Sequence, residues 1–363
     1  MHLFALAAIT ALLAPVQPGL PNRQPQLATG AGLTALVFGS GNSIWFSRSL
    51  DNGQTFSTPS KVAQVPVLAL GRHRGPRAVV AGNTIVISAV YGETPATGPH
   101  AHGLPENGDL VVWRSIDKGQ TWSPPVVVND SPGSAREGLH AIVAGEHGQV
   151  AAVWLDLRAK GTRLYGAYSQ DRGGTWSKNV LIYESPGGTI CQCCHPSLVS
   201  SGKDTYSVMF RNVVEGNRDM YLSEWRINGT VSAPKKLGEG SWALNACPMD
   251  GGGITRKEDG IVTAWRRDHT VFLDTPGQSE KALGEGKDIA IAASPKGGFV
   301  AWTNATGVQL QEPGKEAPIT LSPAGSFPAL ATLPDGSVLA TWEQDGGIAT
   351  RVARSPDAGP DSL

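Results

Sequence analysis

The stretch Ser115-Ile116-Asp117-Lys118-Gly119-Gln120-Thr121-Trp122 predicts a tight turn that joins two β-strands. The aspartate of such a turn accepts hydrogen bonds from backbone amides, the glycine takes a left-handed backbone conformation, and the aromatic side chain packs under the sheet. Two other stretches, Ser49–Phe56 and Ser169–Trp176, repeat this pattern, and residues 226–230 contain a degenerate copy. A turn that recurs in this way indicates a fold made of repeated β-sheets.

The rest of the chain repeats a longer pattern that fits the same fold. A short apolar strand, a turn containing glycine and a second apolar strand recur seven times between residues 33 and 342, while helical periodicity is almost absent. A spacing of about 40–50 residues is that of one propeller blade. We therefore predict an all-β protein, a β-propeller of six or seven four-stranded antiparallel blades. Seven are favoured unless the first and last repeats share one sheet.

The aspartate-containing turns are Asp boxes, and the chain resembles the sialidase superfamily of β-propellers, which carry these BNR repeats. The resemblance is clearest over about residues 70–180 and continues in the strand pattern to about residue 354. It implies a sialidase-like propeller, and a glycosidase if the protein is an enzyme. Asp boxes lie on the outer turns of the blades, so they indicate the fold more than the activity.

Composition narrows the class of protein. The chain has 363 residues, 40% of them hydrophobic and 17% charged, with a formal net charge of −1, which is typical of a folded protein and argues against nucleic acid as a partner. The apolar run Leu3–Leu13 predicts an export signal and a secreted or periplasmic protein, and no other run is long enough to span a membrane. We expect a signal peptide at 1–20, one propeller domain at 25–355, a tail at 356–363, and a monomer.

A propeller brings the starts of its innermost strands together at one end of the central channel. When the predicted inner strands are aligned, Arg74, Glu137 and Cys193 occupy equivalent positions, and His140 and His195 lie close to the same ring. We therefore expect a concave axial pocket there that binds a glycan or another small molecule.

The sialidase resemblance suggests roles for several polar residues. Arg74-Gly75-Pro76 is similar to the Arg-Ile-Pro segment of the family, whose arginine binds the substrate carboxylate, and Glu106 or Asp109 would be the general acid. The candidate catalytic residues are Arg74, Glu106, Asp109, Glu137, Arg211 and Arg218, and the candidate substrate-binding residues are Arg77, Arg136, His140, Asp250 and Arg266. The family's late-chain tyrosine nucleophile has no counterpart, because the last tyrosine is Tyr221.

The cysteines are the least usual feature of the sequence. Cys191, Cys193 and Cys194 lie in Cys-Gln-Cys-Cys-His-Pro, and the one other cysteine, Cys247, lies in the next predicted blade. An even number of cysteines in an exported protein favours disulfides. The alternatives are a Zn or Cu(I) site in which the four thiolates and His195 are the metal ligands, and free or reactive thiols.

Two classes of function follow from these features. The first is an exported, sialidase-like propeller that binds or cleaves a glycan at its axial pocket. The second is a non-catalytic propeller whose Cys/His cluster binds a metal or forms structural disulfides, or which serves as an interaction scaffold.

Overall fold

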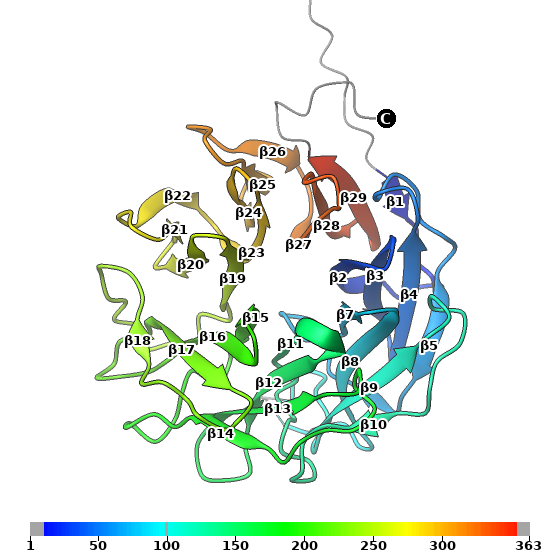
Figure 1. Cartoon of the computed structure of the whole chain (residues 1–363), viewed down its shortest axis with the longest axis horizontal. Helices are drawn as coiled ribbons and strands as arrows, with labels where there is room; N and C mark the ends of the chain where they lie inside the picture. The colour runs from blue at the N-terminus through cyan, green and yellow to red at the C-terminus, as the bar shows by residue number, and fades with distance from the viewer. Residues whose placement is uncertain (1–10, 99–100, 354–363) are drawn as a thin grey trace, which may run out of the picture.

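The computed structural model describes residues 11–98 and 101–353, and they form seven antiparallel β-sheets arranged in a ring (Figure 1). The protein is a seven-bladed β-propeller, which confirms the predicted all-β fold and the larger of the two blade numbers. The one helical segment among the described residues is a short 3-10 turn, Glu146–Gly148. No helix in this part of the chain is long and apolar enough to cross a membrane.

Each blade is a meander whose first strand faces the central channel. The first four blades are β2 (Asn22–Gly30), β3 (Leu33–Ser40), β4 (Ser43–Ser49) and β5 (Ser60–Gln64); β6 (Val67–Leu68), β7 (Arg77–Ala81), β8 (Thr84–Gly92), β9 (Asp109–Ser115) and β10 (Val126–Val127); β11 (His140–Ala144), β12 (Val150–Asp156), β13 (Arg163–Ser169) and β14 (Val180–Tyr183); and β15 (Ser197–Gly202), β16 (Thr205–Arg211), β17 (Met220–Arg226) and β18 (Lys235–Lys236).

The last three blades complete the ring. They are β19 (Gly252–Lys257), β20 (Gly260–Arg267), β21 (Thr270–Asp274) and β22 (Lys281–Glu285); β23 (Lys287–Ser294), β24 (Gly297–Asn304), β25 (Gly307–Gln311) and β26 (Ile319–Ser322); and β27 (Ser326–Thr332), β28 (Val338–Gln344), β29 (Gly347–Ala353) and the N-terminal strand β1 (Ala11–Leu13).

The N-terminal strand closes the ring by completing the seventh blade. Leu12 is paired with Ala349 of β29, so the first and last described segments share one sheet (Figure 1). The predicted signal peptide, residues 1–20, thus includes residues that pair in the folded chain, and its residues 1–10 lie outside the described residues. The predicted tail, 356–363, also lies outside them.

The hydrophobic core lies between neighbouring blades. Both faces of a middle strand are covered, so all eight residues of β3 and all seven of β12 are buried. Such strands appear in sequence as nearly continuous apolar runs instead of alternating ones. The largest fully buried side chains include four tryptophans: Trp154, Trp225, Trp302 and Trp342.

The Asp boxes adopt the predicted turns between the third and fourth strands of the first three blades. In the second box, the Asp117 carboxylate accepts hydrogen bonds from the backbone N–H of Thr121 at 3.0 Å and from its hydroxyl. Gly119, at φ 85°, faces the ring of Phe46 in the preceding blade, and Trp122 packs edge-on against that ring with centroids 5.3 Å apart. These turns therefore join adjacent blades at the outside of the propeller.

Candidate functional site

A split inner strand carries the side chains at the entrance of the axial channel. β6 and β7 both pair with β8, and the residues between them form a small hairpin in which Gly71 and Arg74 bond to each other through their backbones. The two residues at its tip, Arg72 and His73, both have left-handed φ values, 54° and 67°. A two-residue turn with two left-handed residues favours Asn-Gly. The presence of Arg72 and His73 in these strained conformations indicates a functional role for the hairpin.

In three other blades, a β-bulge in the inner strand reorients side chains at the channel entrance. The inner strands β2, β23 and β27 each shift register near their start, and a residue with positive φ lies at each shift: Gln24 at 55°, Asp288 at 58° and Phe327 at 51°. A bulge turns a side chain away from the direction that the regular strand would give it. The ring of Phe327 contacts the ring of His73 edge-on, with centroids 5.3 Å apart. The bulge of β27 and the hairpin that carries His73 therefore meet at one end of the channel.

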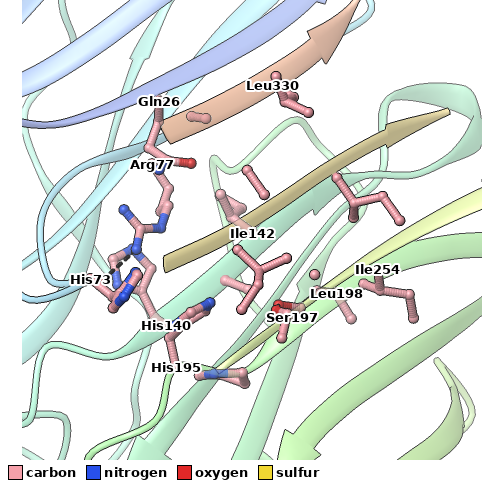
Figure 2. A pocket seen from close by; sticks show the side chains of 18 of the residues that line it. Gln26, His73, Arg77, His140, Ile142, His195, Ser197, Leu198, Ile254 and Leu330 are labelled. Carbon is pink, nitrogen blue, oxygen red and sulfur yellow. Dashed lines mark hydrogen bonds between the residues drawn. The ribbon is translucent and has the colours of Figure 1, made fainter. Parts of the chain in front are cut away.

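These elements surround a pocket of about 270 Å³ at the channel (Figure 2). The polar side chains of its lining come from the first four blades. The apolar residues of its lining come from the inner strands of the third to seventh blades. The polar side chains that line it are Gln26, His73, Arg77, His140, His195 and Ser197.

Arg77 is the cation of this pocket. Its guanidinium donates hydrogen bonds to the backbone carbonyls of His73 and Pro76, and no carboxylate among the described residues lies within ion-pair distance of it. Burial lowers the pKa of Arg77 to about 10, so the side chain stays charged at neutral pH. Arg77 is half-buried, and a partly desolvated cation without an anionic partner favours binding of an anion.

His73 faces two buried carboxylates on the other side of the channel. Its Nε2 lies 2.9 Å from Asp288 Oδ1 and 3.9 Å from Asp250 Oδ1. Asp250 Oδ1 and Asp288 Oδ2 have no hydrogen-bond partner, and burial raises the pKa of Asp250. One ligand atom from each of the three residues lies within 4.8 Å of the others, which is also a spacing that a metal ion can use.

The remaining two histidines of the pocket, the buried His140 and the half-buried His195, are neutral. His140 Nδ1 donates to the carbonyl of Gly138 at 3.3 Å, which leaves Nε2 to accept from the Ser88 hydroxyl at 2.9 Å. Burial, with the charge of Arg77 as a smaller contribution, lowers the pKa of His140 to about 3. Burial also lowers the pKa of His195, whose ring stacks on that of His73.

Two of the three residues that we aligned between blades are in contact. Arg74 Nη2 lies 3.3 Å from Glu137 Oε2, and Arg74 Nε donates to the Glu137 carbonyl at 2.6 Å. Arg136 Nε lies 3.7 Å from the other Glu137 oxygen. The Arg74 guanidinium is thus paired with a carboxylate beside the channel, and neither residue lines the pocket.

The two candidates for a general acid lie elsewhere. Asp109 accepts hydrogen bonds from Asn129 Nδ2 at 2.7 Å and from the Gly133 backbone at 2.6 Å, which fixes the connection between β10 and β11. Glu106 is exposed and accepts a hydrogen bond from Thr94 at 3.3 Å. Neither carboxylate is among the groups that line the axial pocket.

The candidate residues Arg211, Arg218 and Arg266 come together in the fourth and fifth blades, and none of them lines the axial pocket. Arg211 is buried and donates to the carbonyls of Asp250, Arg218 and Arg266. Arg266 donates to the Pro248 carbonyl at 3.1 Å, and its Nε lies 3.7 Å from Asp250 Oδ2. Arg211 and Arg266 also lie over the ring of Trp242, so these side chains connect the loops of the two blades.

Three of the four cysteines form a buried cluster next to these arginines. The Sγ atom of Cys191 lies 3.7 Å from that of Cys193 and 3.0 Å from that of Cys194, and the Cys193–Cys194 separation is 4.0 Å. Cys247 is exposed, and its thiol is not among the groups whose ligand atoms lie within 4.8 Å of one another. His195, which we had grouped with the cysteines, is not among the groups that meet at this point.

Sequence reasoning missed His73, Asp288 and Phe327 as residues of the axial site. A strand pattern does not show where an inner strand is interrupted, and these residues are brought to the channel by a turn and by bulges. The available signal was local: Gly71 and Gly75 flank the hairpin that carries His73.

No family model and no curated protein matches this sequence, whereas many solved structures share its fold. The Hadza microbial sialidase Hz136 is 15% identical, with a TM-score of 0.54 over 92% of this chain and 66% of that one. A leech intramolecular trans-sialidase complexed with 2,7-anhydro-Neu5Ac is 13% identical, with a TM-score of 0.53 over 92% and 68%.

A PL25 polysaccharide lyase, the ulvan lyase bound to -[GlcA(1-4)Rha3S]-, is 11% identical, with a TM-score of 0.57 over 94% of this chain and 95% of that one. The chain spans just under two thirds of the length of the Hadza sialidase. At these identities the likeness shows the fold alone: the chain has a β-propeller fold similar to those of these sialidases and of the polysaccharide lyase.

Proposed function

We propose that this protein acts on an acidic glycan at its axial pocket, with Arg77 binding the carboxylate of the sugar. The observation that carries the proposal is a half-buried guanidinium that lines the pocket without a carboxylate partner among the described residues. A planar guanidinium can bind a carboxylate through two parallel hydrogen bonds. The ligands in the leech and ulvan lyase structures, 2,7-anhydro-Neu5Ac and GlcA, are both carboxylated sugars.

His73 is the group best placed to transfer a proton to or from the bound sugar. Asp288 holds its Nε2 at 2.9 Å, which fixes the ring and leaves Nδ1 for proton exchange. A hydrolase of the usual kind needs two carboxyls in the pocket, about 5–10 Å apart. Because Glu106, Asp109 and Glu137 do not line the pocket, we assign the proton transfer to His73 instead of to a carboxyl pair.

Binding to a panel of sialylated, uronic-acid-containing and neutral glycans tests the proposal. The wild-type protein should bind one class of acidic glycan, and the same glycan with its carboxyl groups reduced to alcohols should bind poorly. Arg77→Gln should weaken binding about 10- to 100-fold, as expected for losing hydrogen bonds to a charged group. Arg226→Gln is the matched control, because it removes an exposed arginine of β17 and should leave binding unchanged.

Turnover of the bound glycan tests the role of His73. His73→Asn should lower kcat with a small effect on binding, and Asp288→Asn should act in the same direction through His73. New reducing ends indicate hydrolysis, and absorbance of an unsaturated sugar indicates elimination. We expect little release of sialic acid, because no tyrosine follows Tyr221 to serve as the nucleophile. Binding of neutral glycans alone, or binding unaffected by Arg77→Gln, contradicts the proposal.

We also propose that the protein is exported and monomeric, as the apolar run Leu3–Leu13 and the composition suggest. Cell fractionation with N-terminal sequencing and measurement of the solution mass test these two points.

A further inference from the structure

The cysteine cluster lies where the fourth and fifth blades meet. Cys191, Cys193 and Cys194 belong to the connection between β14 and β15, and Cys247 to the connection between β18 and β19. The first three side chains are buried, with exposed fractions of 1%, 7% and 2%, and pack against Val213 and Met249. The cluster therefore joins two loops that are more than fifty residues apart in sequence.

The spacing of the sulfur atoms is that of a set of metal ligands. Zinc–thiolate bonds of about 2.3 Å in a tetrahedron place neighbouring sulfurs roughly 3.8 Å apart. The Cys191–Cys193 and Cys193–Cys194 separations, 3.7 and 4.0 Å, agree with that value, while Cys191 and Cys194 are closer, at 3.0 Å. All four cysteines are free in this structure, and the three buried sulfurs contact one another in a triangle instead of standing as separate pairs.

The charges around the cluster suit thiolates. Arg218 Nη1 donates to Cys191 Sγ at 3.3 Å, and its Nε donates to the carbonyl of Leu244 at 3.0 Å. Arg211 is adjacent to the cluster, because its carbonyl accepts a hydrogen bond from the Cys191 N–H at 3.1 Å, and its charge favours the thiolate forms of Cys191 and Cys194. Because three or four thiolates around a divalent or monovalent metal ion carry net negative charge, two nearby guanidinium groups stabilise the bound form. Arg218 contacts both cysteine-bearing loops and so orients the ligands.

We infer that Cys191, Cys193 and Cys194 bind one thiophilic metal ion of the Zn²⁺ or Cu(I) class as thiolates. Each cysteine that binds loses its proton to solvent. Cu(I) is satisfied by the three buried thiolates, whereas a four-sulfur zinc site requires the exposed Cys247, which lies outside this group of converging sulfurs, to move in as the fourth ligand. His195 is excluded from the ligand set because its ring stacks on His73, and this narrows the five-residue set considered from the sequence.

The bound metal would also have a structural role at the axial pocket. Cys194 immediately precedes His195, which lines the pocket, so metal binding to Cys194 holds the backbone that positions this ring. The metal thereby fixes one wall of the pocket without taking part in its chemistry. The inference does not depend on the proposed glycan function, because metal content is measured without a glycan.

Elemental analysis and intact mass of the unreduced full-length protein test the inference. We expect one zinc or copper per chain after extensive desalting, and four alkylatable cysteines after the metal is removed with a chelator under denaturing conditions. Two disulfides, seen as a loss of four hydrogens, would overturn the inference. Four reduced cysteines in a protein that neither contains nor takes up zinc or copper would also overturn it.

Variants and metal substitution locate the site. Cys194→Ser should abolish metal retention, whereas Gln192→Ala, which changes the exposed residue inside the motif, should retain it. Arg218→Gln should weaken retention against a competing chelator about tenfold or more, with partial rescue by Arg218→Lys. If Cys194→Ser fails to fold, loading of the wild-type protein with cobalt and with Cu(I) decides: thiolate-to-cobalt charge-transfer absorption or retention of one Cu(I) against a chelator supports the site, and the absence of both contradicts it. Cys247→Ser separates a four-sulfur zinc site, which it weakens, from a three-sulfur copper site, which it spares.

Discussion

The imidazole rings of His73 and His195 are stacked, with centroids 4.5 Å apart and planes inclined by 28°. His73 comes from the hairpin of the second blade, and His195 from the cysteine loop that precedes the fourth. The contact therefore joins the group assigned to proton transfer to the loop assigned to metal binding, across the entrance of the channel. It gives a physical route by which the cluster affects the pocket.

Removal of this contact should impair the pocket while leaving the metal in place. His195→Ala removes the ring that supports His73, so we expect acidic-glycan binding or turnover to fall several-fold with unchanged metal content. His195→Phe keeps an aromatic ring at this position and should retain more activity than His195→Ala. Equal losses of glycan binding or turnover in both variants would show that the stacked ring does not support His73. Loss of metal in either variant would show that His195 is a metal ligand.

The buried, neutral His140 should make the stability of the protein depend on pH. Its folded-state pKa of about 3 lies below the value near 6.5 of an unfolded chain, so the unfolded state takes up the proton first as the pH falls. The contribution of His140 is fully present above about pH 6.5 and is lost toward pH 3, with a slope of at most about 1.4 kcal/mol per pH unit.

Chemical unfolding of His140→Gln between about pH 5 and pH 6.5 measures this contribution, since unfolded aspartates and glutamates stay mostly ionised there. The variant should be less stable than the wild-type protein at neutral pH, because it disturbs the bonds to Ser88 and Gly138. Its stability should fall less steeply with acid than that of the wild type. Parallel curves for the two proteins would mean that His140 does not set the acid sensitivity.

The fold could be predicted from sequence further than the site could. The Asp boxes and the seven strand repeats are local patterns, and both correspond to elements of the structure. The convergence of Arg74 and Glu137 also followed from aligning inner strands, because blade symmetry relates equivalent positions. His73 and Asp288 could not be found in this way, because an irregular turn and a bulge place them outside the strand repeat.

The third Asp box should contribute to stability without affecting the pocket. Asp171 accepts hydrogen bonds from the Thr175 backbone at 2.8 Å and hydroxyl at 2.9 Å, at an outer turn of the third blade. By analogy with other side-chain caps, Asp171→Ala should cost roughly 0.5–2 kcal/mol of unfolding free energy. Glycan binding by the folded variant should match the wild type. Weaker binding at unchanged thermal stability would assign this box a role in function.

Residues 11–20 should stabilise the closed ring. Leu12 pairs with Ala349, Gln17 Nε2 donates to the Ser40 carbonyl at 2.7 Å, and Asn22 bonds to the backbone of Ala14 and Val16. A protein that begins after residue 20 would leave one edge of β29 unpaired and lose these bonds. Since each is worth about 0.5–1.5 kcal/mol, we expect a loss of roughly 3 kcal/mol relative to a protein that begins at Ala11.

Thermal and chemical unfolding of the two N-terminal truncations, compared with N-terminal sequencing of the exported protein, completes this test. The protein that begins at Ala11 is the matched control, because it lacks only residues 1–10 and keeps the strand that pairs with β29. Lower stability of the shorter protein supports ring closure by β1. Equal stability of the two truncations would show that β1 is dispensable, as removal of a signal peptide of residues 1–20 requires.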